Sequence, residues 1–165
     1  MKTSILFLLL NTCLLSQNVD MYLSLIHEGQ SQGVKENLPE LISKYPNDPG
    51  VLYLQALLTA NGMKSLEFYS KLIEKFPESK YAGKASVKIG EYFYARGLYS
   101  QAGRQLCLIP RKYPRLSNMQ AIIDMMVSSF QAIGENDSVK YLNASADVLL
   151  SKYSKVASAI LPNIP

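Results

Sequence analysis

Residues that could carry out catalysis are few in this chain, and their spacing does not bring them together. The 165-residue sequence has a single histidine, His27, and two cysteines, Cys13 and Cys107. An isolated imidazole cannot build a zinc cluster or activate a distant thiol. Carboxylates such as Glu36 and Glu74 stand among lysines, and the sequence has no glycine-rich phosphate loop or nucleophile elbow. We therefore expect a protein that is not an enzyme and that holds no metal or cofactor.

Basic side chains form the first group with spacing suited to binding. Lys80, Lys84 and Lys88 are four residues apart and share one face of a helix. Arg104 and Arg111 follow further along the chain. An ordinary solvated helix face is the simpler explanation. The alternative is a basic surface that attracts acidic proteins or anionic lipid headgroups, whose binding would weaken with salt.

Aromatic side chains form the second group. The chain has 11 Tyr and 5 Phe, and Tyr92, Phe93, Tyr94 and Tyr99 are clustered. A helical core absorbs many such rings, but three successive positions cannot all point into one core. We expect one of them, Tyr94, to face a groove or a neighbouring element. Exposed aromatic rings are common anchors for a partner.

Composition excludes several classes of protein. Hydrophobic residues make up 48% of the chain and charged residues 18%, as is typical of a folded protein. The net charge of +4 is modest, so we expect no nucleic-acid partner. No segment after the N-terminus is long and apolar enough to span a membrane. Cys107 has no second cysteine in the mature chain, and we expect it to be a small buried side chain on a helix.

Single glycines and aromatic–proline pairs recur along the chain and divide it into similar units. Glycines spaced 33, 35 and 37 residues apart alternate with aromatic–proline pairs, each preceded by lysine. The glycines are Gly29, Gly62, Gly97 and Gly134, and the pairs are Tyr45-Pro46, Phe76-Pro77 and Tyr113-Pro114. Glycine suits the tight turn within a helix pair, and proline ends one pair before the next.

The pattern predicts an all-α fold, an α-solenoid of about four antiparallel helix pairs. These pairs span roughly 19–45, 50–76, 80–113 and 118–160. Expected N-caps are Asp48, Ser79 and Ser117.

Two further prolines lie inside the expected helices. We expect Pro39 to delay the second helix of the first pair, with Asn37 as its cap. We expect Pro110 to kink its helix or stop it early.

One segment carries a family resemblance. Within 85–114 the pattern consists of Ile89, Gly90, Phe93, Gly97, Tyr99, Ala102, Leu106, Ile109 and Pro114. This arrangement resembles a tetratricopeptide repeat (TPR), which implies that Gly90 and Ala102 lie where two helices cross closely. The stretch from Phe76 to Ala102 is similar to exported TPR proteins of the bacterial envelope, the Tol–Pal coordinator family and the outer-membrane assembly lipoprotein. The resemblance implies a scaffold that binds an envelope protein or peptide in a concave groove.

The N-terminus has the layout of a secretory signal peptide. Lys2 is followed by an apolar run that ends near Ser16, so we expect residues 1–17 to be the signal and 18–165 to be the TPR-like domain. A lipid anchor at Cys13 is the less favoured alternative, because the residues around it fit a lipobox poorly. The protein is then exported, and periplasmic or associated with the outer membrane.

The last expected helix carries an unusual apolar stripe. Its members are spaced alternately three and four residues apart, as in a heptad seam. They are Val139, Leu142, Ala146, Leu149, Tyr153, Val156 and Ile160. The simpler explanation is a cap on the end of the solenoid. The alternative is a dimer seam, which would make the protein a self-assembling structural subunit of an envelope complex.

Overall fold

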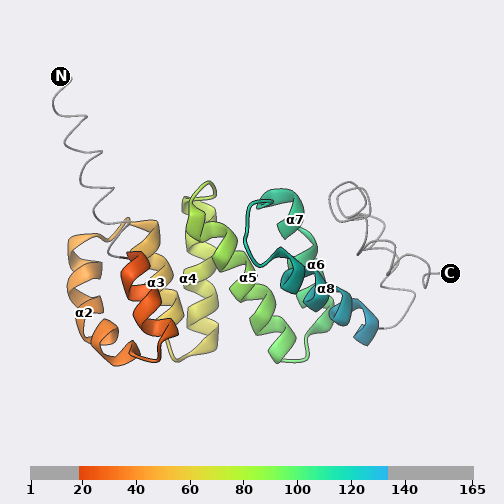
Figure 1. Cartoon of the computed structure of the whole chain (residues 1–165), viewed down its shortest axis with the longest axis horizontal. Helices are drawn as coiled ribbons and strands as arrows, with labels where there is room; N and C mark the ends of the chain where they lie inside the picture. The colour runs from red at the N-terminus through yellow and green to blue at the C-terminus, as the bar shows by residue number, and fades with distance from the viewer. Residues whose placement is uncertain (1–18, 134–165) are drawn as a thin grey trace, which may run out of the picture. The chain divides into compact units, whose positions relative to one another are not determined.

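All regular structure in the described part of the chain is helical. The computed structural model describes residues 19–133, and this range contains α-helices and no strand. The chain divides into two compact units, Met1–Phe76 and Pro77–Pro165. Figure 1 shows short connections between successive helices in each unit. The prediction of an all-α fold is confirmed for these residues.

The first unit is built around α3. A helix over 19–27 precedes α2 (Ser31–Lys44), α3 (Pro49–Leu58) and α4 (Gly62–Lys75). The apolar helix α3 packs against both α2 and α4 (Figure 1). Its buried side chains include Val51, Leu52, Tyr53, Leu54 and Ala56. The Tyr53 ring lies 5.7 Å from the Tyr69 ring of α4, which joins the two helices through an aromatic pair.

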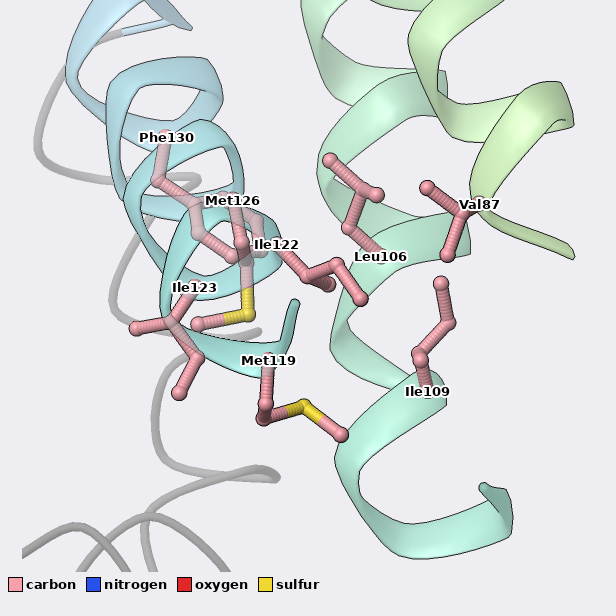
Figure 2. Packing of buried hydrophobic residues seen from close by; sticks show 8 residues of the cluster. All are labelled: Val87, Leu106, Ile109, Met119, Ile122, Ile123, Met126 and Phe130. Carbon is pink, nitrogen blue, oxygen red and sulfur yellow. The ribbon is translucent and has the colours of Figure 1, made fainter. Parts of the chain in front are cut away.

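The described part of the second unit, residues 77–133, packs four helices around one apolar cluster. These are α5 (Lys80–Ala95), α6 (Tyr99–Cys107), α7 (Ile109–Lys112) and α8 (Met119–Ile133). Figure 2 shows the cluster side chains that these helices contribute: Val87, Leu106, Ile109, Met119, Ile122, Ile123, Met126 and Phe130. Most of them come from α8, whose apolar face covers α6. The position of α6 is therefore fixed from two sides, by α5 and by α8.

Two glycines allow the helices of the second unit to approach closely. A Cβ atom at Gly90 of α5 would lie 2.4 Å from Cδ2 of Leu106 on α6. A Cβ atom at Gly103 of α6 would lie 2.7 Å from Cε1 of Phe130 on α8. The predicted close crossing is confirmed at Gly90. Ala102 is fully buried. Gly103 is a second such contact, which the sequence analysis missed.

Two of the predicted glycine turns are confirmed in detail. Gly29 and Gly97 have positive φ angles of 84° and 71°. At each turn the glycine N–H and the following N–H bond back to the preceding helix, as Gln30 N does to Leu25 O at 2.8 Å and Leu98 N to Phe93 O at 2.9 Å. This is the Schellman arrangement, and it closes the helix end with a residue that needs no Cβ.

The three aromatic–proline pairs also share one backbone conformation. Tyr45, Phe76 and Tyr113 have φ between −130° and −135° and ψ between 57° and 60°. Each donates its N–H to the carbonyl four residues earlier and ends its helix there. The following proline disfavours the helical region for the residue before it. The recurring sequence mark therefore corresponds to a recurring helix end.

The N-cap of α3 offers a direct test of this local structure. Oδ1 of Asp48 accepts hydrogen bonds from Gly50 N at 2.8 Å and Val51 N at 2.9 Å, and Pro49 follows as the first helical residue. We expect Asp48→Ala to lower the free energy of unfolding by about 1 kcal/mol, because two helix-end donors lose their acceptor. Urea titration followed by circular dichroism measures the change. Asp48→Asn keeps an acceptor, and an equal loss in both variants would contradict the capping role.

Pro110 and Ser79 behave as predicted. The helix before Pro110 stops at Cys107, and the short helix α7 restarts at Ile109. Pro110 takes an early position in α7, where its missing N–H costs little. Ser79 caps α5, and its Oγ accepts from Tyr81 N at 3.2 Å.

Two of the predicted helix breaks were wrong. Gly62 is the first residue of α4 and not a turn residue, because extended Thr59 and Asn61 make the turn without a positive φ. Pro39 lies inside α2, which runs unbroken from Ser31. Proline frees the carbonyl four residues earlier, and here that residue is Lys35, which is exposed and open to water.

Two of the predicted helix caps were also wrong. Asn37 does not cap a helix; its side-chain amide donates to Gly33 O at 3.0 Å within α2. Helix α8 begins at Met119, so Asn118 and not Ser117 takes the capping position. The carbonyl of Asn118 accepts the first helical bond, from Ile122 N at 3.2 Å.

The helices end within the ranges predicted for the first three pairs. The signal peptide over 1–17, Gly134 and the apolar stripe over 139–160 lie outside the described residues. No helix between residues 19 and 133 has the length and apolar character needed to cross a membrane.

Candidate partner-binding surface

Helix α5 leaves one basic face open. Of residues 81–90, all are buried except Lys84, which is exposed, and Lys88, which is half-buried. Lys80 at the start of the helix is also exposed. Lys80, Lys84 and Lys88, termed here the α5 lysine face, thus occupy one side of α5 over a stretch, residues 80–90, that is otherwise buried. The structure confirms the shared face that their spacing predicted.

The lysines of this face contact neighbouring side chains. Nζ of Lys80 lies 5.1 Å from the centre of the buried Tyr81 ring, and Nζ of Lys84 lies 5.7 Å from it. Cations over an aromatic face are attracted to its electrons. Lys88 forms an ion pair with Glu91, with Nζ 2.7 Å from Oε2. The charges at the start of the face therefore lie above a ring, and the last one is partly balanced.

The clustered aromatic residues lie where α5 turns into α6. Tyr92, Phe93, Tyr94 and Tyr99 are all half-buried. The Tyr94 ring packs edge-on against Tyr99 across the Gly97 turn, with ring centres 5.4 Å apart. Tyr92 packs against Phe93 at 6.0 Å. Tyr94 is thus paired within its own hairpin and shows part of its ring to solvent.

Helix α6 is held in register with α5 by a polar contact. Nε2 of Gln105 donates to Oγ of buried Ser86 at 2.8 Å and approaches the Ser86 carbonyl at 3.3 Å. This contact and the Gly90–Leu106 approach direct one side of α6 toward α5. Arg104 is exposed on another side, and Arg111 is exposed on α7. The two arginines therefore lie on other helices than the lysines.

The nucleophile and ligand candidates do not form a reactive centre in the described residues. His27 is exposed at the end of the first helix. Cys107 is half-buried and not fully buried as expected; it packs against the apolar cluster, and its Sγ donates to Arg104 O at 3.2 Å. Between residues 19 and 133 no three His, Cys, Asp or Glu side chains gather to hold a metal ion.

Net charge is divided unevenly between the two units. Residues 19–76 contain seven acidic and five basic side chains, a net charge of −2. Residues 77–133 contain three acidic and eight basic side chains, a net charge of +5. The positive balance of the whole chain therefore comes from the second unit, which holds the α5 lysine face.

The sequence did not predict the exposed leucine Leu108 of this unit. Leu108 is 59% exposed, whereas Leu106 and Ile109 on either side of it are fully buried. The three-residue spacing of the buried pair could have placed Leu108 on the opposite side of the helix.

Comparison with known proteins adds no assignment. Neither protein families, nor curated proteins, nor solved structures give a match to this chain.

Proposed function

We propose that the chain is an exported, non-catalytic scaffold of the TPR kind that binds an acidic segment of another envelope protein through the α5 lysine face. The open side of α5 carries the proposal, because it is basic while the rest of residues 81–90 is buried. A row of cations on a packed helix attracts acidic segments and selects against basic ones. The recurring helix ends and the close crossing at Gly90 support a TPR-like repeat.

The half-buried tyrosines supply the apolar part of the same surface. Tyr94 lies near the end of α5 beyond Lys88, and Tyr99 begins α6. Their paired rings are already ordered by contact with each other. Rigid aromatic rings bind a partner with little loss of conformational entropy. We therefore assign charge recognition to the lysines and anchoring to the Tyr94–Tyr99 pair.

The test begins with capture of the partner and ends with its affinity. Tagged mature protein is incubated with envelope extract at low and high salt, and the recovered partner is then purified and titrated by calorimetry. We expect the triple variant Lys80→Gln, Lys84→Gln, Lys88→Gln to weaken binding at least tenfold, on the order of the loss of three screened charge contacts. We expect Tyr94→Phe to retain binding and Tyr94→Ala to weaken it, since the first keeps the ring.

A matched control separates local contacts from total charge. Lys64, Lys71 and Lys75 of α4 are exposed, and changing all three to Gln removes the same charge from the first unit. Equal affinity losses in the two triple variants would overturn the proposal. Recovery of the protein alone, as a dimer by light scattering, would instead favour a self-assembling subunit that acts through residues 139–160.

A further inference from the structure

The stretch between Glu91 and Asp124 is a strongly cationic part of the second unit. Residues 92–123 contain no Asp or Glu, although they include five basic side chains. These are Arg96, Arg104, Arg111, Lys112 and Arg115, and all five are exposed. The acids at the two ends have contacts of their own: Glu91 pairs with Lys88, and Asp124 accepts from Gln120 Nε2 at 2.8 Å. The stretch itself therefore contributes five positive charges and no negative charge.

Most of these cations share one side of α6 and α7. Leu108, between the two helices, keeps a helical backbone with φ −78° and ψ −21°, so helical spacing continues through the break. Arg104, Leu108 and Arg111 then fall at positions i, i+4 and i+7 on one side. The opposite side carries Leu106 and Ile109, which are fully buried in the cluster of Figure 2. The outward side is therefore fixed by the core.

The exposed leucine stands among these cations. Leu108 has Arg104 four residues before it and Arg111 and Lys112 three and four residues after it, and Arg115 follows just beyond the end of α7. We term Arg104, Leu108, Arg111, Lys112 and Arg115 the α6–α7 basic surface. Its centre is a protruding apolar side chain, and its rim is cationic.

We propose that the α6–α7 basic surface binds the face of an anionic phospholipid bilayer. Guanidinium groups bind phosphate with paired hydrogen bonds, and clustered Lys and Arg are attracted to negatively charged membranes. An apolar side chain surrounded by cations enters the boundary between headgroups and acyl chains. A protruding Leu108 can insert into a deformable bilayer surface. An acidic peptide would instead be expected to bind in a groove. This inference goes beyond the proposed function and uses different helices of the unit.

Vesicle sedimentation with the full chain tests the proposal. The vesicles are phosphatidylcholine alone or phosphatidylcholine with about 30% phosphatidylglycerol. We expect binding to the anionic vesicles at low salt, and at least about tenfold weaker binding to neutral vesicles or at about 0.5 M salt. We expect the triple variant Arg111→Gln, Lys112→Gln, Arg115→Gln to lose at least about tenfold, and Leu108→Ser about fivefold.

The control is again the α4 triple variant, Lys64→Gln, Lys71→Gln, Lys75→Gln, which removes the same charge from exposed positions. We expect it to bind anionic vesicles within about twofold of the unchanged protein. Circular dichroism and melting temperature check that each variant is folded. Equal binding to neutral vesicles, equal losses in the two triple variants, or effective competition by soluble polyglutamate would each overturn the proposal. The α5 triple variant should still bind vesicles, which separates this surface from the proposed protein site.

Discussion

Replacing Phe130 with alanine should lower the free energy of unfolding by about 3–5 kcal/mol. Phe130 is 1% exposed and is among the largest fully buried side chains in the described part of the chain. Its ring fills the space over Gly103, where α6 and α8 meet. Truncation removes buried apolar area and leaves a cavity that Gly103 has no side chain to fill. The contact between α6 and α8 therefore loses its largest contributor.

Urea denaturation of the full chain, followed by circular dichroism, measures this loss. Phe130→Leu keeps most of the volume and should cost clearly less than the alanine variant. Leu108→Ala truncates an exposed side chain and should change stability by less than about 0.5 kcal/mol. A loss below about 1 kcal/mol for Phe130→Ala would mean that this ring does not hold the core as described.

A valine at position 90 is the second change with a large expected effect. Any Cβ atom there would lie 2.4 Å from Cδ2 and 2.8 Å from Cγ of Leu106. Leu106 is fully buried between α5 and α8, so it has little room to move. We expect Gly90→Val to lower the free energy of unfolding by about 3 kcal/mol, because α5 and α6 must separate to admit three added carbon atoms.

The same chain supplies a control for helix propensity. Gly33 lies in α2, and a Cβ atom there would meet nothing within 4 Å. Gly33→Ala should raise stability by about 0.5–1 kcal/mol, since alanine favours a helix over glycine. Gly90→Ala gains the same propensity but meets Leu106, so it should be less stable than the unchanged protein. If both alanine variants are stabilising, the close crossing at Gly90 is not tight.

Local chemistry explains which parts of the fold could be predicted from sequence. Gly29 and Gly97 need positive φ angles, and Asp48 followed by proline suits a helix start. These requirements lie within a few neighbouring residues, and the sequence displays them directly. The aromatic–proline pairs are equally local, because proline restricts the residue before it.

Features that depend on distant contacts were harder to predict. Gly103 is explained only by Phe130 of another helix, and no local pattern marks that pairing. The predicted break at Pro39 was wrong because the carbonyl that this proline frees faces water. The remaining loss of stability is smaller than the gain from continuing the amphipathic helix. The predicted glycine turn at Gly62 was wrong because Thr59 and Asn61, both in an extended conformation, make the turn.

The candidate surfaces show the same division. The i, i+4, i+8 spacing of the α5 lysine face was sufficient to place it on one side of a helix. The pairing of Tyr94 with Tyr99 required knowledge of the Gly97 turn geometry. Leu108 was overlooked because Pro110 obscured whether helical spacing continues past Cys107.

The methionines of the chain differ in how easily oxidants can reach them. Met63 and Met21 are 63% and 51% exposed, whereas Met119 and Met126 are buried in the cluster of the second unit. Oxidation to the sulfoxide makes a flexible apolar side chain polar. Among the methionines between residues 19 and 133, peroxide therefore reacts first at Met63 and Met21, where a polar sulfoxide is solvated. Peroxide reaches Met126 only when α8 separates from α6. The amount of Met126 sulfoxide would therefore measure how often these two helices separate.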